Sequence, residues 1–427
     1  MHLRILILVD CYYPSPISSA KLVHDLGVEL QQRGHEVCVL TPCESLSEPI
    51  TTTLEDNLII TRVKTGRIKG AHKVRRALEE AQLSATLWRK AKCFLRRNPC
   101  DLILFYSPSI FFGPLVRKLK GLWRCPAYLI LRDIFPEWAV DAGILHRGLI
   151  YRFFRQVEKY QYGTADLIAV QSPGNLSYFA RAFPNRQYRL KVLYNWTFLN
   201  EPNLPQTNYR SRLGLEGSFV YVYGGNLGVA QDTDNLVRLA VQLASRSNIH
   251  FVLIGSGSEV SRLGNVVHEK GLRNVHILPA VAQNEYLSMV SEFDAGLISL
   301  DAGLKTHNIP GKLLSYFYWG LPVLASVNRG NDLFEIINKN RVGFCCVNGE
   351  DGNLAIAAQK LVDEPNLKLE MGENARRLLE QTFSTKEAVE QIFGHLGEEG
   401  FVFTKSSSSV PVRPRPIGQY PLSLRES

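Results

Sequence analysis

A loop with two lysines carries the clearest chemical signal in this sequence. It contains Lys305, Asn308, Pro310, Gly311 and Lys312. Pro310 fixes the backbone where a helix can begin, and the helix that follows is expected to end at Gly320. Apolar segments at 293–300 and 322–325 predict a strand on either side. Free N–H groups at a helix N-terminus beside two cations suit an anion, so we interpret the loop as the place of a nucleotide diphosphate.

Two glycine-rich loops support a ligand site in the same half of the chain. Their candidate residues are Gly224, Gly225, Asn226, Gly255 and Gly257. They follow apolar segments at 219–223 and 249–254, which predict neighbouring strands. Glycine lets a ligand approach the backbone closely, although a tight turn explains either loop taken alone. Ligands of open α/β sheets bind at the carboxyl ends of strands, so the pair favours a phosphate or sugar site.

Charged residues follow a strand in the first half of the chain. Arg132, Asp133 and Glu137 come directly after the apolar segment 128–131, beside bulky aromatic residues. Charges in such a place are costly unless they are paired or functional. Two interpretations stay open: a structural Arg132–Asp133 ion pair, or an Asp133 that acts as a base or binds an acceptor hydroxyl.

Two other polar loops follow strands in this half. Ser18 and Ser19 precede a helix after the first strand, and Tyr106 and Ser107 follow the strand at 102–105. A hydroxyl in these positions either caps the adjoining element or faces a cleft between domains.

These loops need a scaffold that brings strand ends together, and the order of elements predicts one. Strand-like and helix-like segments alternate, which predicts an α/β fold of two doubly wound, Rossmann-like parallel sheets. A chain of 427 residues suits two such domains. A polar, proline-bearing stretch follows residue 196, so we place one domain at 1–198 and a second at 206–384. A helix at 385–402 is expected to cross back to the first domain, and 403–427 to form a flexible tail.

The net positive charge of the chain indicates which kinds of binding partner to expect. The net charge is +9 at pH 7, and basic residues interleave with aromatic and aliphatic ones in an expected helix at 69–97 and a cluster at 147–155. Such surfaces suit anionic lipid headgroups, although a solvated helix face accounts for them equally well. No recognised nucleic-acid module accompanies them, so we expect no nucleic-acid partner.

The cysteines and the hydropathy pattern point to a compartment. Eight cysteines occur without a C-x-x-C pair or a metal-ligand spacing, which favours reduced thiols and no metal site. No apolar run is long enough for a transmembrane helix. We therefore expect a cytoplasmic protein associated peripherally with the inner face of the plasma membrane.

Taken in order, these segments resemble the retaining glycosyltransferases of family 4, which have the GT-B fold of two Rossmann-like domains facing across a cleft. The similarity covers about residues 3 to 396 and rests on the motifs at 132–137, 223–228 and 305–325. It is closest to bacterial O-antigen and exopolysaccharide enzymes of the N-acetyl-L-fucosaminyltransferase-like subgroup. The resemblance implies a UDP-sugar donor in the second domain, an acceptor in the first, closure around both, and no metal or other cofactor.

The resemblance also assigns roles. Lys312 and Lys305 would stabilise the leaving UDP together with the Gly224-Gly225 backbone, and Asp133 would orient the acceptor hydroxyl. Many family members carry a Glu that holds the donor ribose where this chain has Ser315. A hydroxyl binds a ribose more weakly than a carboxylate does.

Two further departures concern charge. Family members often carry Arg and Lys around the first glycine loop, where this chain has Asn226 and Gln231, and a His where it has Arg132. The cations at the diphosphate are therefore expected from the loop at 305–312.

The sequence thus predicts transfer of an N-acetylated hexosamine, 6-deoxy forms such as N-acetyl-L-fucosamine included, from a UDP-sugar to an undecaprenyl diphosphate-linked saccharide. The products would serve O-antigen, capsule or exopolysaccharide synthesis. Two alternatives stay open: a UDP-N-acetylhexosamine 2-epimerase on the same double Rossmann plan, and a non-catalytic sugar-nucleotide-binding scaffold, for which Ser315 is the main argument.

Overall fold

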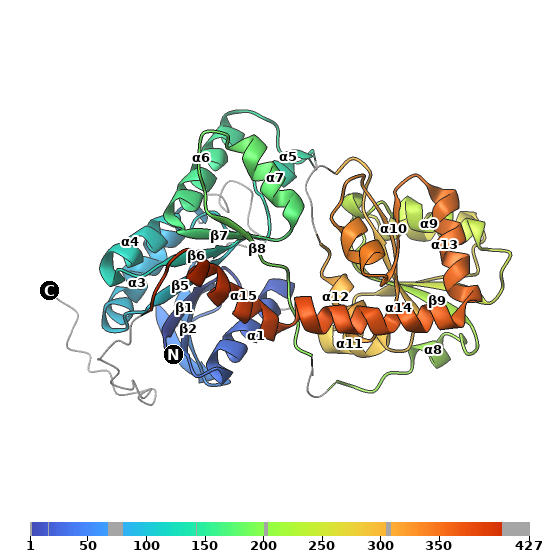
Figure 1. The fold of residues 1–427 in the computed structure, drawn as a ribbon, viewed down its shortest axis with the longest axis horizontal. Coiled ribbons are helices and arrows are strands. Elements are labelled where there is room, and N and C mark those ends of the chain that lie inside the picture. The colour runs from blue at the N-terminus through green and yellow to red at the C-terminus, as the bar shows by residue number, and fades with distance from the viewer. Residues whose placement is uncertain are drawn as a thin grey trace.

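Two α/β domains stand side by side in the computed structural model of the chain (Figure 1). The structure describes residues 2–15, 17–66, 80–141, 143–199, 204–304 and 309–403. Lys305, Asn308, Asn200 to Asn203, the first part of the expected helix at 69–97 and the tail from 404 lie outside the described residues.

The first domain is built on an eight-stranded sheet in the order β3-β4-β2-β1-β5-β6-β7-β8. All neighbouring pairs are parallel except β3 and β4. The strands are β1 (Arg4–Leu8), β2 (Glu36–Cys43), β3 (Ile50–Glu55), β4 (Leu58–Lys64), β5 (Leu102–Tyr106), β6 (Ala127–Ile130), β7 (Leu167–Val170) and β8 (Leu190–Val192). The helices are α1 (Ser18–Gln32), α3 (Leu83–Arg97), α4 (Gly113–Trp123), α5 (Glu137–Asp141), α6 (Leu149–Thr164) and α7 (Pro173–Ala182).

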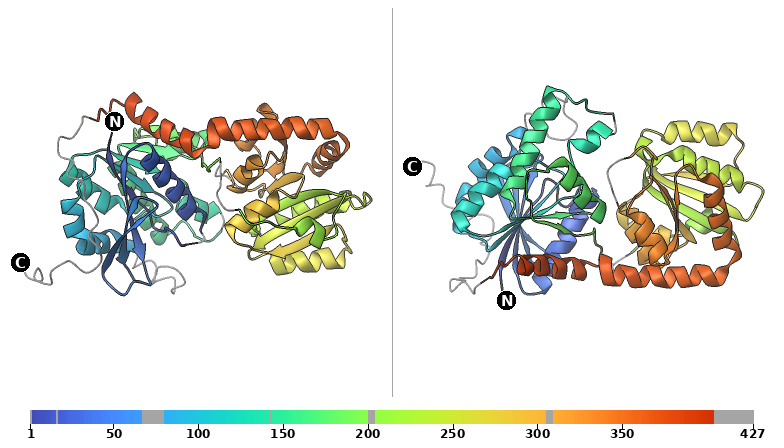
Figure 2. Two further views of the ribbon diagram at one scale, coloured as in Figure 1. Left: turned by 90° about the horizontal axis from the view of Figure 1, so that it is seen from below. Right: turned by 45° about the horizontal axis from the view of Figure 1, so that its top comes forward.

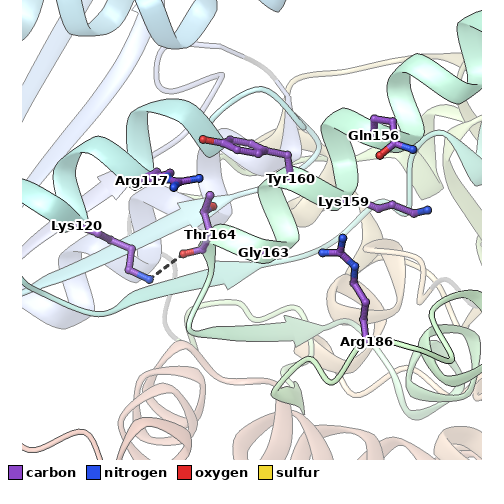
Figure 3. Close-up of a pocket in the computed structure, with 8 residues that line it drawn as sticks. All are labelled: Arg117, Lys120, Gln156, Lys159, Tyr160, Gly163, Thr164 and Arg186. Atoms are coloured by element: carbon purple, nitrogen blue, oxygen red, sulfur yellow. Dashed lines mark hydrogen bonds between the residues drawn. The ribbon is translucent and has the colours of Figure 1, made fainter.

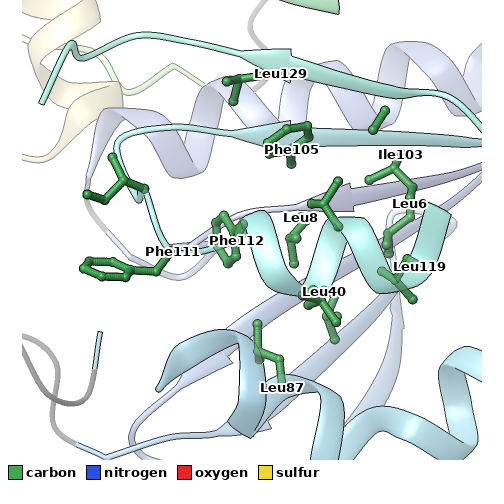
Figure 4. Close-up of a cluster of buried hydrophobic side chains, with 14 of the residues drawn as sticks. Leu6, Leu8, Leu40, Leu87, Ile103, Phe105, Phe111, Phe112, Leu119 and Leu129 are labelled. Carbon is green, nitrogen blue, oxygen red and sulfur yellow. The ribbon is translucent and has the colours of Figure 1, made fainter. Parts of the chain in front are cut away.

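Helices cover both faces of this sheet because alternate strand residues point to opposite sides. Leu6 and Leu8 pack into a core beneath α3 and α4, which Figure 4 shows with Phe105 and Leu119. Ile5 and its neighbour Ile7 pack instead beneath α1. Both sets of side chains are fully buried, which fits a central parallel strand.

The second domain repeats the plan with a six-stranded parallel sheet in the order β11-β10-β9-β12-β13-β14. Its strands are β9 (Phe219–Asn226), β10 (Ile249–Ser256), β11 (Val275–Pro279), β12 (Ala295–Ser299), β13 (Val323–Val327) and β14 (Gly343–Val347). Its helices are α8 (Tyr209–Arg212), α9 (Thr233–Gln242), α10 (Val260–Glu269), α11 (Gln283–Val290), α12 (Lys312–Tyr318), α13 (Asp351–Asp363) and α14 (Pro365–Leu378).

The end of the described chain ties the domains together. α14 lies against the second domain, and after a π-helical turn α15 (Thr385–Glu398) lies against the first (Figures 1 and 2). Val389 and Ile392 of α15 are fully buried in the core beneath α1. The linker after β8 joins the same turn, because Thr197 N–H donates to Phe383 O at 2.9 Å and Thr385 N–H donates to Thr197 O at 3.0 Å.

The expected fold class is confirmed, with local corrections. Strand β3 was not expected, because its alternating polar threonines give a weak apolar signal and its exposed edge position demands none. The segment 332–338, whose pattern predicts a helix, is helical from 333 to 339, and the part at Glu335–Lys339 is a π-helix. Helices α4, α6, α7 and α13 were also not expected from the sequence.

Candidate functional site

The carboxyl ends of the two sheets meet at the junction between the domains. Gln171, directly after β7, donates from Nε2 to the carbonyl of Ile309 at 3.0 Å. At the start of α7, Gly174 N–H donates to both carboxylate oxygens of Asp332 at 3.0 and 3.2 Å. Because Ile309 and Asp332 belong to loops of the second domain, the candidate donor and acceptor loops face a common space.

Lys312 is the charged group on the donor side. It is the first residue of α12, and its Nζ lies 3.3 Å from the centre of the Tyr223 ring. Among the described residues it has no hydrogen bond or ion pair, and burial of the ammonium lowers its pKa well below the ordinary value. A desolvated cation without a carboxylate partner is costly, so the site favours an anion beside it.

Three of the candidate glycines are required by packing. A Cβ on Gly224 would overlap the Tyr286 ring, and one on Gly255 would overlap the carbonyl oxygen of Gly225 in the neighbouring strand. A Cβ on Gly257 would overlap the carbonyl of Leu227. These glycines let β9 and β10 and their loops approach closely, so packing alone requires them at these positions.

Gly225 differs from the others because it borders the lysine. Its φ is +115°, and a Cβ placed there would lie 3.7 Å from Cε of Lys312. The exposed backbone at Gly225 and the ammonium of Lys312 therefore line the same spot. A phosphate at that spot would meet both.

The polar residues of the first glycine loop are engaged with one another. Asn226 Nδ2 donates to Gln231 Oε1 at 2.8 Å, and the same oxygen accepts from Gly228 N–H at 3.2 Å. Leu227 N–H donates to Ser256 O at 2.9 Å, which joins the two loops. Asn226 thus holds the loop in shape.

The remaining donor candidates surround α12. Pro310 precedes the helix and Gly311 is exposed, with no atom within 4 Å of an added Cβ. Ser315 is half-buried in the following turn. Lys305 and Asn308 lie outside the described residues. α12 has only 7 residues, so its dipole contributes less than the charge of Lys312 does.

On the acceptor side, Arg132 is a buried structural cation. Its guanidinium donates to the carbonyls of Leu131 and Tyr194, each at 3.3 Å, and lies over the Trp196 ring. It forms no ion pair with Asp133. Its Nε is buried without a hydrogen-bond partner, and burial lowers its pKa.

Asp133 remains available to a ligand. Its carboxylate has no hydrogen bond or ion pair with any described residue, and it is half-buried. Burial raises its pKa, while the nearby Arg132 charge opposes that rise. A carboxylate made more basic by its surroundings is a better partner for a hydroxyl proton.

Tyr106 and Ser107 lie beside this pair. Ser107 is fully buried, and its hydroxyl donates to the backbone carbonyl of Asp133 at 3.4 Å. Burial raises the pKa of Tyr106 to about 12, against the effect of Arg132. The Ser107 hydrogen bond thus helps to fix the backbone at Asp133.

The three remaining acceptor candidates, Ser18, Ser19 and Glu137, lie at the starts of helices α1 and α5. Ser18 is exposed at the start of α1, Ser19 is buried, and neither makes a side-chain cap there. Glu137 accepts from the Tyr151 hydroxyl at 2.9 Å and pairs with Arg147, so it joins α5 to α6.

A cavity of about 500 Å³ beside these loops was missed by sequence reasoning. Its walls include Asp10, Ser15, Ser109, Phe135 and Trp138. Asp10 and Ser109 follow β1 and β5 closely, and that position was the available signal. The cavity mixes polar groups with aromatic rings, which is the usual lining of a small-molecule site.

Metal sites and membrane-spanning helices can be judged for the described residues. No group of three His, Cys, Asp or Glu side chains there could hold a metal ion. Within the same ranges, no helix has the length and apolar character needed to cross a membrane.

Comparisons with known proteins agree with this geometry. A family model described as glycosyl transferase 4-like domain matches residues 19–196, and one described as glycosyl transferases group 1 matches residues 205–378. The chain is 27% identical over 300 residues to WbjE of Pseudomonas aeruginosa, named a probable glycosyltransferase, and the match spans 67% of this chain and 69% of WbjE. It is 23% identical over 231 residues to WcaI of Escherichia coli K12, named for colanic acid biosynthesis, spanning 51% of this chain and 55% of WcaI.

Solved structures share the fold. Sucrose-phosphate synthase from Thermosynechococcus elongatus superposes with a TM-score of 0.70 at 17% identity, covering 93% of this chain and 98% of that one. Anabaena HepE in complex with UDP and glucose superposes with a TM-score of 0.66 at 18% identity, covering 93% of this chain and 100% of that one.

The packing role of Gly255 can be tested. We expect Gly255→Ala to lower the free energy of unfolding by about 3 kcal/mol or more, because the added methyl overlaps the Gly225 carbonyl. Chemical denaturation measures the change. Gly264→Ala on α10 is the control, since no atom lies within 4 Å of its added Cβ. Equal stability of the two variants would contradict this account of the loop.

Proposed function

The chain belongs to the family 4 type of glycosyltransferases with the GT-B fold, and from this premise we propose that it moves a sugar from a UDP-sugar to a lipid-linked saccharide. The observation that carries the proposal is the Lys312 ammonium, which has no ion-pair partner within the described ranges, beside the exposed Gly225 backbone. A diphosphate supplies the missing negative charge, and the HepE structure contains UDP. Family membership favours transfer over the epimerase and the scaffold.

The finer identities extend this proposal. The donor sugar is an N-acetylated hexosamine, 6-deoxy forms such as N-acetyl-L-fucosamine included, and the acceptor is a saccharide on undecaprenyl diphosphate. The names of WbjE and WcaI support a bacterial glycan product. Ser315, one turn into α12, would contact the donor ribose.

The residues suggest how transfer proceeds with retention. The bond between the sugar anomeric carbon and the UDP oxygen breaks, and the acceptor oxygen attacks the same face. Lys312 and the Gly225 backbone stabilise the charge that develops on UDP. Asp133 accepts a hydrogen bond from the acceptor hydroxyl and orients it, and a phosphate oxygen of the departing UDP takes the proton. No protein nucleophile is needed.

A membrane surface would present the acceptor. Exposed apolar side chains gather where α5 leads into α6: Ile144 is 69% exposed, Leu149 82% and Ile150 64%. Arg147 and Arg152 lie among them. Apolar groups edged by arginines suit an anionic bilayer surface, and the described part of α3 adds exposed cations at Arg89, Lys92, Arg96 and Arg97. These exposed side chains support our proposal that the protein associates with the inner face of the plasma membrane.

Replacement of Lys312 should strongly reduce the rate of sugar transfer without lowering the stability of the folded protein. We expect Lys312→Met to lower turnover about 100-fold or more, because one preorganised charge at the leaving group is removed. The free energy of unfolding should rise, since a desolvated cation is replaced by an apolar chain of similar length. UDP release, measured with and without a lipid-linked acceptor, reports turnover.

The assay also separates the alternatives. Wild-type protein should release UDP only when the acceptor is present, whereas an epimerase would release none. Wild-type turnover by Lys312→Met would overturn the donor site, and a loss of stability in that variant would make the lysine structural.

The membrane contact is tested by an apolar-to-polar change. We expect the double variant Leu149→Ser with Ile150→Ser to bind anionic vesicles at least about tenfold more weakly, because two exposed apolar side chains leave the bilayer interface. Vesicle co-sedimentation measures the binding. Ile356→Ser on α13, 65% exposed in the other domain, is the matched control. Equal binding by both proteins would place the membrane contact elsewhere.

A further inference from the structure

A second cavity, of about 670 Å³, lies in the first domain away from the candidate site. Figure 3 shows its lining, which comes from α4, α6 and the segment after α7. The residues are Arg117, Lys120, Gln156, Lys159, Tyr160, Gly163, Thr164 and Arg186. No residue of this lining is acidic.

The cavity carries an excess of positive charge. Lys120 is neutralised by Asp166, whose carboxylate lies 2.7 Å from its Nζ. Arg117, Lys159 and Arg186 form no ion pair with any residue in the part of the chain that the structure describes. Three like charges around one hollow repel one another, so an anion in the hollow is favoured.

The basic cavity and the candidate site lie at opposite ends of the parallel strands of the first sheet. α4 ends at Trp123, shortly before β6 begins, and α6 ends at Thr164, shortly before β7 begins. Their last turns therefore stand at the amino ends of the parallel strands. Asp133 and the acceptor cavity stand at the carboxyl ends, so the basic cavity does not belong to the site of transfer.

Gly163 keeps the cavity open beside a cation. A Cβ built on Gly163 would lie 4.0 Å from a guanidinium nitrogen of Arg186, with no closer neighbour. Figure 3 shows the Arg186 side chain reaching toward α6, beside Lys159. A longer side chain at this position would therefore enter the cavity without disturbing the core.

The cavity shares a helix face with the apolar surface described above. Leu149, Phe153, Gln156, Tyr160 and Gly163 follow one another at steps of three or four residues along α6, and all are exposed. Phe153 is 52% exposed and Tyr160 40%. A rise of 1.5 Å per residue puts Gly163 about 15 Å along the helix from Phe153. A bilayer that receives the apolar end would thus meet the cations at the level of its headgroups.

We propose that this basic cavity binds the phosphate headgroup of an anionic membrane lipid. The inference rests on the membrane contact proposed for the start of α6, but it does not depend on the transfer reaction. The cations recognise the phosphate, and the apolar end of the same helix face favours a lipid as its source over a soluble anion.

Charge placed inside the cavity tests the proposal. Gly163→Glu puts a carboxylate beside Arg186, and Gly163→Gln has the same size without the charge. We expect Gly163→Glu to bind vesicles of phosphatidylcholine with phosphatidylglycerol about fivefold more weakly than wild type, and Gly163→Gln less than about twofold. Gly264→Glu on α10 controls for net charge and should leave binding unchanged.

A second cavity variant and a neutral-lipid control complete the vesicle-binding experiment. Lys159→Ala with Arg186→Ala should weaken the same binding at least about tenfold, which keeps the test valid if Gly163→Glu does not fold. Binding to phosphatidylcholine alone should be equal for all variants. Unchanged binding to anionic vesicles in both cavity variants would overturn the proposal. Inorganic phosphate or pyrophosphate binding that is lost in Gly163→Glu, with vesicle binding unchanged, would also overturn it, because the anion would then be a soluble one.

Discussion

An ammonium group held against an aromatic ring, with no negative partner among the described residues, governs the donor side of this protein. Lys312 begins α12, and its Nζ lies over Tyr223 on the neighbouring strand. Burial of this cation lowers its pKa, which means that the folded protein bears a cost while the site holds no anion. A diphosphate removes that cost when it binds. The same atoms that are unfavourable alone are therefore suited to stabilise charge on a leaving group.

The surrounding elements make this arrangement possible. Tyr286 packs against Gly224, and the Gly255 backbone lies against Gly225, so the strand ends approach closely enough to expose backbone beside Lys312. The domains meet through Gln171 and Asp332, while α15 anchors the second domain to the first. These contacts put Asp133 and Lys312 on loops that face one space.

Part of the fold and part of the candidate site were predictable from the sequence. Apolar strands such as 102–105 and 249–254 were predicted close to their observed bounds, Leu102–Tyr106 and Ile249–Ser256, since a strand buried on both faces is a short unbroken apolar run. Lys312 was predicted because it stands with Lys305 in a loop that leads into a helix N-terminus, a combination that suits an anion. The roles of the glycines were not predictable, since the Gly255 contact with Gly225 joins residues from two strands. The same holds for Arg132, whose partners at Tyr194 and Trp196 lie far along the chain.

The central claim is that the diphosphate of UDP binds beside the buried Lys312 ammonium. Proton uptake on UDP binding tests this claim most directly. Lys312 has a lowered pKa in the free protein, and a bound diphosphate should raise it toward its ordinary value near about 10.4. Between those two pKa values the protein takes up a proton as UDP binds, and below the lower or above the higher value it does not. Calorimetric titration in buffers of different ionisation enthalpy measures this uptake. The account predicts uptake that approaches one proton in wild type and vanishes in Lys312→Met; UDP binding with no uptake at any pH in wild type would contradict it.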